Sequence, residues 1–123
     1  ETSHNDRMTL TLAMSYSSRW EIANATERIV ADIQSKKLKR SEITEELFST
    51  YLTTSNMPDP ELLIRTSGEM RISNFLLWQI AYTELFFSPK LWPEFTKEDL
   101  YDAIINYQNR ERRFGLTSDQ IKS

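Results

Sequence analysis

The pattern of apolar and polar positions divides the chain into short strands and longer amphipathic helices. Apolar runs at 62–64 and 85–87 are bounded by prolines and polar residues, which is typical of buried strands. Alternating Thr and Leu over 9–15 predicts a third strand. Helical spacing of apolar residues predicts three amphipathic helices, which begin near positions 18, 41 and 96. Their apolar faces are Ile22, Ala25, Ile29 and Ile33; Ile43, Leu47, Phe48, Tyr51 and Leu52; and Leu100, Ile104 and Tyr107.

Polar residues at the ends of these segments predict where each helix starts and stops. Ser18 with Glu21 three residues later forms a capping-box pattern, and Ser41 and Thr96 can cap the other two helices. The last helix should end in a basic turn followed by a glycine cap, whose residues are Arg110, Arg112, Arg113 and Gly115. We interpret those arginines first as partners of the helix dipole, and the alternative is a role in an active site.

Residues 73–82 are almost entirely apolar, which predicts a fourth helix, buried on most of its faces and starting at Ser73. The loop at 65–69 would then join the carboxyl end of a strand to the start of a helix, where open α/β sheets bind ligands. Arg65 and Arg71 flank this loop, and two guanidiniums beside a helix start indicate an anion site that suits phosphate. The alternative for the arginines is a surface salt bridge with Glu69.

Composition narrows the function classes. The formal net charge of −3 argues against a broad nucleic-acid surface, and the absence of cysteine excludes a disulfide framework. No apolar run reaches the ~18 residues of a membrane span, and nothing resembles a signal peptide, so the expected location is cytoplasmic.

Three strands alternating with four helices predict an α/β fold, a parallel sheet flanked by helices, within one domain or part of one. Such a sheet is small, and several large aromatic residues need neighbours in a core or a subunit interface. These residues are Phe75, Trp78, Tyr82 and Trp92. We therefore expect residues 1–123 to be part of a larger fold, completed by an N-terminal half, a partner chain or both.

The segment at 62–87, LLIRTSGEMRISNFLLWQIAYTELFF, carries a family resemblance. It resembles the C-terminal signature of the cis-prenyltransferases, the undecaprenyl diphosphate synthase family: an arginine, a Gly-Glu turn, a second arginine, a serine and an Asn-Phe-Leu-Leu-Trp-Gln run. Weaker similarity covers about Leu10 to Gly115. The resemblance implies a homodimeric transferase of roughly twice this length. Its catalytic aspartate lies in an N-terminal motif that this chain lacks.

The resemblance also implies roles for individual residues. The family condenses isopentenyl diphosphate with an allylic diphosphate, here expected to be farnesyl diphosphate, to give a cis-polyprenyl diphosphate such as the undecaprenyl carrier precursor of cell-wall synthesis. Arg65, Arg71, Ile72 and Ser73 match positions that bind isopentenyl diphosphate. Ser73 could equally be a plain helix cap. At most a peripheral membrane contact, through the lipid product, is expected.

Glu84 matches a Mg²⁺-binding glutamate of the family. We expect it at the C-terminal end of the fourth helix among apolar neighbours, where an acid needs a cation to stay charged. Magnesium accepts a few carboxylates together with waters and substrate phosphates. The alternative is a Glu–Arg ion pair across a subunit interface.

The chain departs from the family pattern at its first strand end. Asn-Tyr-Gly-Gly-Arg is replaced by Ser15-Tyr16-Ser17-Ser18-Arg19, so a conformation that needs glycine is in question there. Two other functions compete with the enzyme interpretation: a non-catalytic partner subunit of a heteromeric prenyltransferase, and an unrelated phosphate-binding or protein-interaction module. The paired arginines favour the enzyme, but we expect the isolated 123-residue chain to be inactive.

Overall fold

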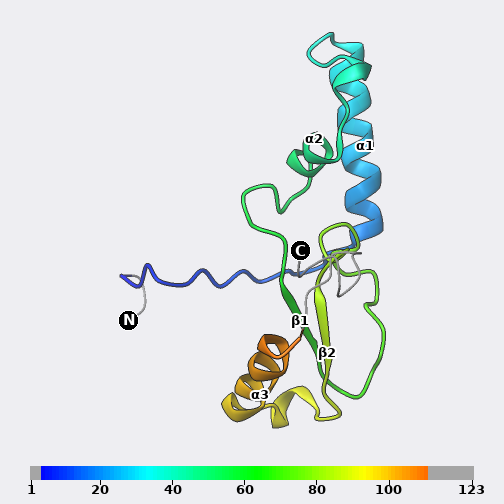
Figure 1. The fold of residues 1–123 in the computed structure, drawn as a ribbon. Helices are drawn as coiled ribbons and strands as arrows, with labels where there is room; N and C mark the ends of the chain where they lie inside the picture. The colour runs from blue at the N-terminus through cyan, green and yellow to red at the C-terminus, as the bar shows by residue number, and fades with distance from the viewer. Residues whose placement is uncertain (1–3, 111–123) are drawn as a thin grey trace, which may run out of the picture.

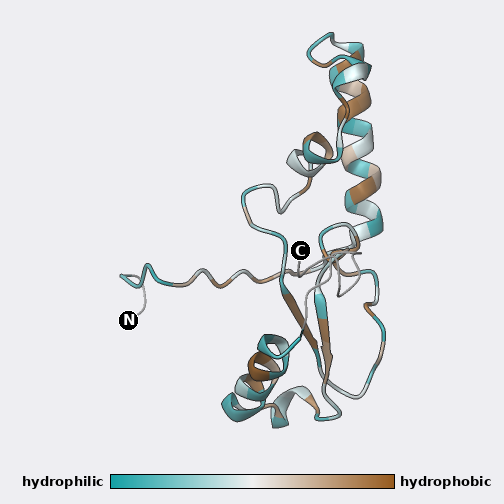
Figure 2. Cartoon of the chain, in the orientation of Figure 1, coloured by the Kyte–Doolittle hydropathy of each residue, from teal (hydrophilic) through white to brown (hydrophobic). Residues whose placement is uncertain are grey.

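A two-stranded parallel sheet lies at the centre of the protein, whose structure here is a computed structural model that describes residues 4–110 (Figure 1). Strand β1 (Leu62–Arg65) pairs with β2 (Glu84–Phe87), so that Leu62 faces Glu84 and Arg65 faces Phe87. Both strands are hydrophobic along most of their length (Figure 2). The predictions of strands at 62–64 and 85–87 and of a parallel α/β arrangement are confirmed.

Three α-helices accompany the sheet in the described part of the chain. Helix α1 (Ser18–Gln34) rises away from the strands with α2 (Glu45–Thr50) beside it, and α3 (Lys97–Gln108) lies along the strands at the other end (Figure 1). Two 3-10 turns, Arg40–Glu42 and Trp92–Glu94, precede α2 and α3. None of these described helices combines the length and hydropathy of a membrane span.

The observed helix caps confirm one of the three predicted N-terminal capping residues and correct the other two. Thr96 caps α3, as predicted, and it also forms a capping box with Asp99. Helix α1 is capped by Ser17 rather than Ser18, and α2 by Thr44 rather than Ser41. In both corrected cases the hydroxyl that accepts a backbone N–H of the first turn belongs to a residue with extended backbone, as a capping residue requires. Arg112, Arg113 and Gly115 lie outside the described residues.

The predicted helix at 73–82 is wrong, because the segment forms a series of turns. Ser73, Asn74 and Leu76 have φ values of 47°, 61° and 49°, in the left-handed region that interrupts a right-handed helix. The side chains of Trp78 and Gln79 bond to different elements: the Trp78 indole donates to Ser49 Oγ of α2, and Gln79 reaches Glu21 of α1. Tertiary contacts therefore override the local helical preference.

The predicted strand at 9–15 is not formed within the described residues. The segment is an extended strap that projects away from the sheet and helices (Figure 1), and its side chains are exposed. Met8, Leu10, Leu12 and Met14 are each at least 75% exposed. Buried apolar residues in the described part are few, and they are Ala25, Ile29, Leu52, Ile80 and Ala103. Large apolar side chains thus stay uncovered within the described residues.

The apolar stripes of the helices are less buried than predicted. Leu100 and Ile104 of α3 are 40% and 37% exposed, while Ala103 between them is fully buried. Among the aromatic residues, Trp78 is half-buried and packs on Phe48 with ring centroids 4.4 Å apart. Tyr82 and Trp92 are 68% and 73% exposed. Neither ring is buried in a core of this chain, and the place of these residues in a subunit interface stays a prediction.

Candidate functional site

The loop after β1 is fixed by backbone hydrogen bonds to the segment after β2. Ser67 N–H donates to the Lys90 carbonyl at 2.7 Å, and Gly68 N–H donates to the Ser88 carbonyl at 2.9 Å. Ser67 and Gly68 have φ values of 71° and 66°, which turn the chain back. Ser88 N–H also donates to the Arg65 carbonyl at 2.7 Å, so hydrogen bonds join the two segments past the strand ends and support the residues that follow β1.

Arg65 and Arg71 meet at one carboxylate. The Nη2 atoms of Arg65 and Arg71 donate to opposite oxygens of Glu69. Arg65 is the more enclosed guanidinium, with a side chain 26% exposed against 64% for Arg71. The structure thus brings together the two arginines that flank the loop, and it also contains the Glu69 salt bridge considered as the alternative.

Each guanidinium retains donors for a ligand. An arginine has five N–H groups, and only one nitrogen of each is bonded to Glu69. Two positive charges and one negative charge leave the cluster with net positive charge. Glu69 can therefore orient both guanidiniums while they present further N–H groups to a phosphate. Sequence reasoning missed this bridging role, although Glu69 stands between the two arginines in the sequence.

Ile72 and Ser73 follow Arg71 in the turn segment. Ile72 is half-buried, and its carbonyl accepts from Phe75 N–H at 3.1 Å. Ser73 is exposed and does not cap a helix, because the helix it was predicted to start is absent. The two residues therefore lie beside Arg71 on a tight turn.

Glu84 lies elsewhere than predicted. It is the first residue of β2 rather than the last of a helix, and it accepts from Arg110 Nη1 at 2.7 Å. Since Glu84 pairs with Leu62 and side chains alternate along a strand, Glu84 and Arg65 lie on opposite faces of the sheet. Three residues of strand also separate them by about 10 Å along the sheet.

The Glu84–Arg110 pair joins α3 to β2 within one chain. Arg110 also donates to the Leu85 carbonyl at 2.9 Å and, through Nε, to Asn106 Oδ1 at 2.9 Å. Arg110 therefore bonds mainly to the sheet, which corrects its interpretation as a partner of the helix dipole. The alternative for Glu84, an ion pair with arginine, is observed, although within the chain rather than across subunits.

Glu84 is chemically suited to bind Mg²⁺, but it does not form a complete metal site with the other described residues. Its carboxylate is a hard oxygen ligand of the kind that Mg²⁺ prefers. Across residues 4–110, however, no three His, Asp or Glu side chains converge to hold a metal ion. Glu84 can supply one ligand, and the remaining ligands would have to be water, phosphate oxygens or residues outside this set.

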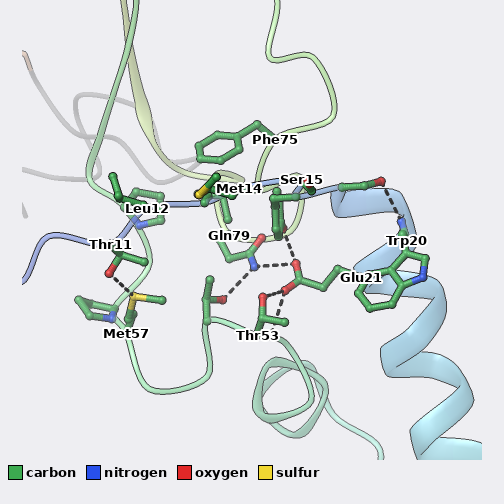
Figure 3. Close-up of a pocket in the computed structure, with 17 residues that line it drawn as sticks. Thr11, Leu12, Met14, Ser15, Trp20, Glu21, Thr53, Met57, Phe75 and Gln79 are labelled. Atoms are coloured by element: carbon green, nitrogen blue, oxygen red, sulfur yellow. Dashed lines mark hydrogen bonds between the residues drawn. The ribbon is translucent and has the colours of Figure 1, made fainter.

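A second polar cluster surrounds Glu21 on α1 (Figure 3). Glu21 is 2% exposed, and its Oε1 accepts from Thr53 N–H at 2.8 Å and from the Thr53 hydroxyl. Its Oε2 accepts from the Tyr16 hydroxyl and from Gln79 Nε2 at 3.2 Å. Sequence reasoning assigned Glu21 only to a capping box. A better signal was its place on the same helix face as Ala25 and Ile29, which predicts a buried acid with partners.

The pKa values in this cluster follow from burial and hydrogen bonding. Burial raises the pKa of Glu21, but hydrogen bonds from Thr53, Tyr16 and Gln79 outweigh it and hold the pKa below its ordinary value. Burial and then the Glu21 carboxylate raise the pKa of the Tyr16 phenol. The cluster therefore contains an ionised carboxylate and a protonated phenol at neutral pH.

A cavity of about 520 Å³ lies next to this cluster, between the strap at 11–17, the segment at 53–60 and the turns at 75–79 (Figure 3). Most of its lining is apolar, and neither Arg65 nor Arg71 lines it. Residues 11–15 of the cavity wall belong to the extended strap, and their side chains are exposed. The cavity is therefore separate from the arginine cluster.

The serines at positions 17 and 18 fit the backbone that the structure has. Ser17 has φ −140°, and Ser18 is helical, so neither needs the conformational freedom of glycine. Positive φ occurs instead at Ser15, at 54°. The replacement of two glycines by serines is thus compatible with this turn.

Comparison with known proteins places these features in a family. A family model described as putative undecaprenyl diphosphate synthase matches residues 1–115. An isoprenyl transferase of Geobacter sulfurreducens is 61% identical over 99% of this chain and 50% of its own length. The Coxiella burnetii ditrans,polycis-undecaprenyl-diphosphate synthase, described as (2E,6E)-farnesyl-diphosphate specific, is 48% identical over 98% of this chain and 51% of its own length.

Solved structures agree with the sequence comparisons. Lavandulyl diphosphate synthase from Lavandula x intermedia, in complex with dimethylallyl diphosphate, has a TM-score of 0.82 at 43% identity, covering 85% of this chain and 45% of that one. A probable undecaprenyl diphosphate synthase from Campylobacter jejuni has a TM-score of 0.73 at 39% identity, covering 93% and 50%. The chain spans about half the length of the relatives it matches. With a parallel sheet, a two-arginine cluster at its carboxyl edge and this degree of identity, the chain belongs to the undecaprenyl diphosphate synthase family of prenyltransferases.

Proposed function

We propose that the protein containing this chain condenses isopentenyl diphosphate with an allylic diphosphate to form a cis-polyprenyl diphosphate. The reaction forms a carbon–carbon bond, releases diphosphate from the allylic substrate and a proton from isopentenyl diphosphate, and leaves a cis double bond. The observation that carries the proposal is the pair of guanidiniums held on Glu69 at the carboxyl edge of the sheet. An allylic co-substrate is supported by the description of the Coxiella relative as farnesyl-diphosphate specific and by the complex of the lavender synthase with dimethylallyl diphosphate.

In this proposal the chain supplies the isopentenyl diphosphate subsite. Arg65 and Arg71 use their remaining N–H groups to bind the diphosphate, while Glu69 keeps the two guanidiniums side by side. Ser73 offers a hydroxyl next to Arg71, and Ile72 forms part of the pocket wall. The role of these residues is to bind and orient the substrate rather than to transfer a proton.

Glu84 would contribute one oxygen ligand to Mg²⁺. When bound, the ion would neutralise diphosphate charge and so favour its departure. The remaining metal ligands and the allylic subsite are assigned to the rest of the protein. A second copy of the protein would complete the homodimer. A cytoplasmic enzyme that makes the undecaprenyl carrier precursor is the biological role that fits this assignment.

The test is Arg65→Ala or Arg71→Ala in the full-length protein encoded by the gene. Loss of one charge-assisted contact, about 1.5–3 kcal/mol, should raise the KM for isopentenyl diphosphate by roughly 10- to 150-fold. The KM for the allylic substrate should stay unchanged, because its subsite lies outside this chain. Arg40→Ala is the matched control, since Arg40 is an exposed arginine of a 3-10 turn. Unchanged isopentenyl diphosphate kinetics in both variants would refute the assigned roles.

A further inference from the structure

The first turn of α1 is satisfied by a residue far away in the sequence. Asn74 accepts from Ser18 N–H through its backbone carbonyl at 3.0 Å and from Arg19 N–H through Oδ1 at 2.9 Å. Its Nδ2 donates to Ser17 Oγ at 2.9 Å. The first N–H groups of a helix lack intrahelical partners. Because Asn74 accepts from two of them, the start of α1 does not offer these N–H groups to an anion.

A fourth hydrogen bond strengthens the same junction. The Ser18 hydroxyl, fully buried, accepts from Leu77 N–H at 2.8 Å. The turn segment is thus attached to α1 on both sides of Leu76, by Asn74 and by Leu77. We call these four hydrogen bonds, among Ser17, Ser18, Arg19, Asn74 and Leu77, the α1 clamp.

The clamp begins directly after the residues assigned to the substrate. Ser73 precedes Asn74 in the chain, and Arg71 lies two residues before Ser73. Both are exposed, as is Met70 at 81%, so packing does little to fix this part of the loop. Glu69 holds one end of the loop through the Arg71 guanidinium, and Asn74 holds the other.

The residue type at position 74 suits this task. Its φ is 61°, a conformation that asparagine tolerates better than most residues. Its amide carries both an acceptor and a donor, and the clamp uses both. Glycine would keep the backbone conformation and remove the amide, whereas aspartate would keep the acceptor that caps α1.

We propose that Asn74 is a positioning residue that holds Arg71, Ile72 and Ser73 against α1 and so sets their place at the isopentenyl diphosphate subsite. This inference rests on the proposed function. Asn74 does not touch the substrate and acts only through the loop. Its loss should therefore weaken binding of one substrate selectively, because the loop samples conformations in which Arg71 and Ser73 no longer converge on the diphosphate.

The experiment measures both KM values, kcat and the melting temperature of the full-length protein. Asn74→Gly should raise the KM for isopentenyl diphosphate by about 10-fold, the effect of one or two lost hydrogen bonds, without changing the KM of the allylic substrate. Asn74→Asp should restore most of the affinity. Asn56→Gly, an exposed asparagine in the turn before β1, is the matched control and should behave as wild type.

Two results would overturn the inference. A lower melting temperature with both KM values unchanged would show that the clamp only stabilises the fold, and an equal rise in both would show that it does not act selectively. If Asn74→Gly fails to fold, Ser18→Gly removes a single clamp bond and should raise the same KM by about 3-fold. Failure of the proposed function has a different signature, namely that Arg71→Ala leaves the KM for isopentenyl diphosphate unchanged.

Discussion

Replacement of Glu21 should destabilise the full-length protein more than replacement of any exposed acid on α1. The carboxylate accepts four hydrogen bonds and is 2% exposed. Thr53 is exposed, so water can replace Glu21 as the acceptor for its N–H and its hydroxyl, and Tyr16 and Gln79 are the donors that lose most. At about 1.5–3 kcal/mol for each of these two bonds to a charged group, Glu21→Ala should cost about 3–6 kcal/mol of unfolding free energy.

The isosteric variant Glu21→Gln should cost less, about 1–2 kcal/mol, because it keeps one oxygen acceptor and the shape of the side chain. Its new NH₂ group would face a donor, either Thr53 N–H or the Gln79 amide. Rotation of the Gln79 amide can relieve this clash, since its Oε1 is buried without a hydrogen-bond partner in the wild type. The rotated amide would accept from residue 21 instead of donating to it.

The pH dependence of the same variant tests the ionisation state. Because the folded protein holds the pKa of Glu21 below its ordinary value of 4.5, the charged form stabilises the fold. That contribution is complete above the ordinary value and is lost as the pH falls through the folded-state pKa. The stability gap between wild type and Glu21→Gln should therefore shrink between pH 7 and about pH 3.

Urea denaturation followed by tryptophan fluorescence, at fixed protein concentration, measures these differences. Glu27→Gln and Glu27→Ala are the matched controls, because Glu27 lies on the exposed side of the same helix and should change stability by at most about 0.5 kcal/mol. The reasoning fails if Glu21→Ala is no more harmful than Glu27→Ala. It also fails in its electrostatic part if the gap for Glu21→Gln is the same at both pH values.

Two further predictions concern α3 and the isolated chain. The pKa of Asp99 is held at about 2, mainly by Lys90 and then by the Thr96 N–H and hydroxyl. The charged form of Asp99 therefore stabilises the fold above the ordinary pKa of 3.8, and this stabilisation is lost as the pH falls toward 2. Lys90→Ala should raise the titration midpoint of the Asp99 carboxyl carbon in NMR, and an unchanged midpoint would contradict the ion pair. The purified 123-residue chain should show no turnover with isopentenyl and farnesyl diphosphates, since Arg65 and Glu84 alone do not complete a site; measurable turnover would contradict this expectation.

The parts of the fold that the sequence predicted well are those fixed by neighbours along the chain. The strand at 62–65 follows Pro60, the strand at 84–87 precedes Ser88-Pro89, and Thr96 caps the helix that it immediately precedes. Local turn chemistry and apolar periodicity are sufficient for such elements. The convergence of Arg65 and Arg71 was predictable for the same reason, because one short loop separates them.

The parts that failed depend on partners distant in sequence. Nothing near Asn74 indicates that its carbonyl and amide bond to the start of α1, more than 50 residues away, and these bonds prevent a helix at 73–82. Glu84 was placed at a helix end that does not exist, and its partner Arg110 lies 26 residues further on. Likewise, the alternating residues of 9–15 can form a strand only where a neighbouring strand pairs with them, and none does so within the described residues.

Arg65 and Glu84 cannot bind the same diphosphate from within one copy of the described chain, because they occupy opposite faces and opposite ends of the sheet. The ion pair with Arg110 also directs one oxygen of Glu84 toward α3. A metal ion bound by Glu84 would thus take its other ligands from outside residues 4–110 or from a second copy. Since the chain spans about half the length of its relatives, the catalytic unit that we propose is the whole protein, in which these 123 residues supply the arginine subsite and one metal ligand.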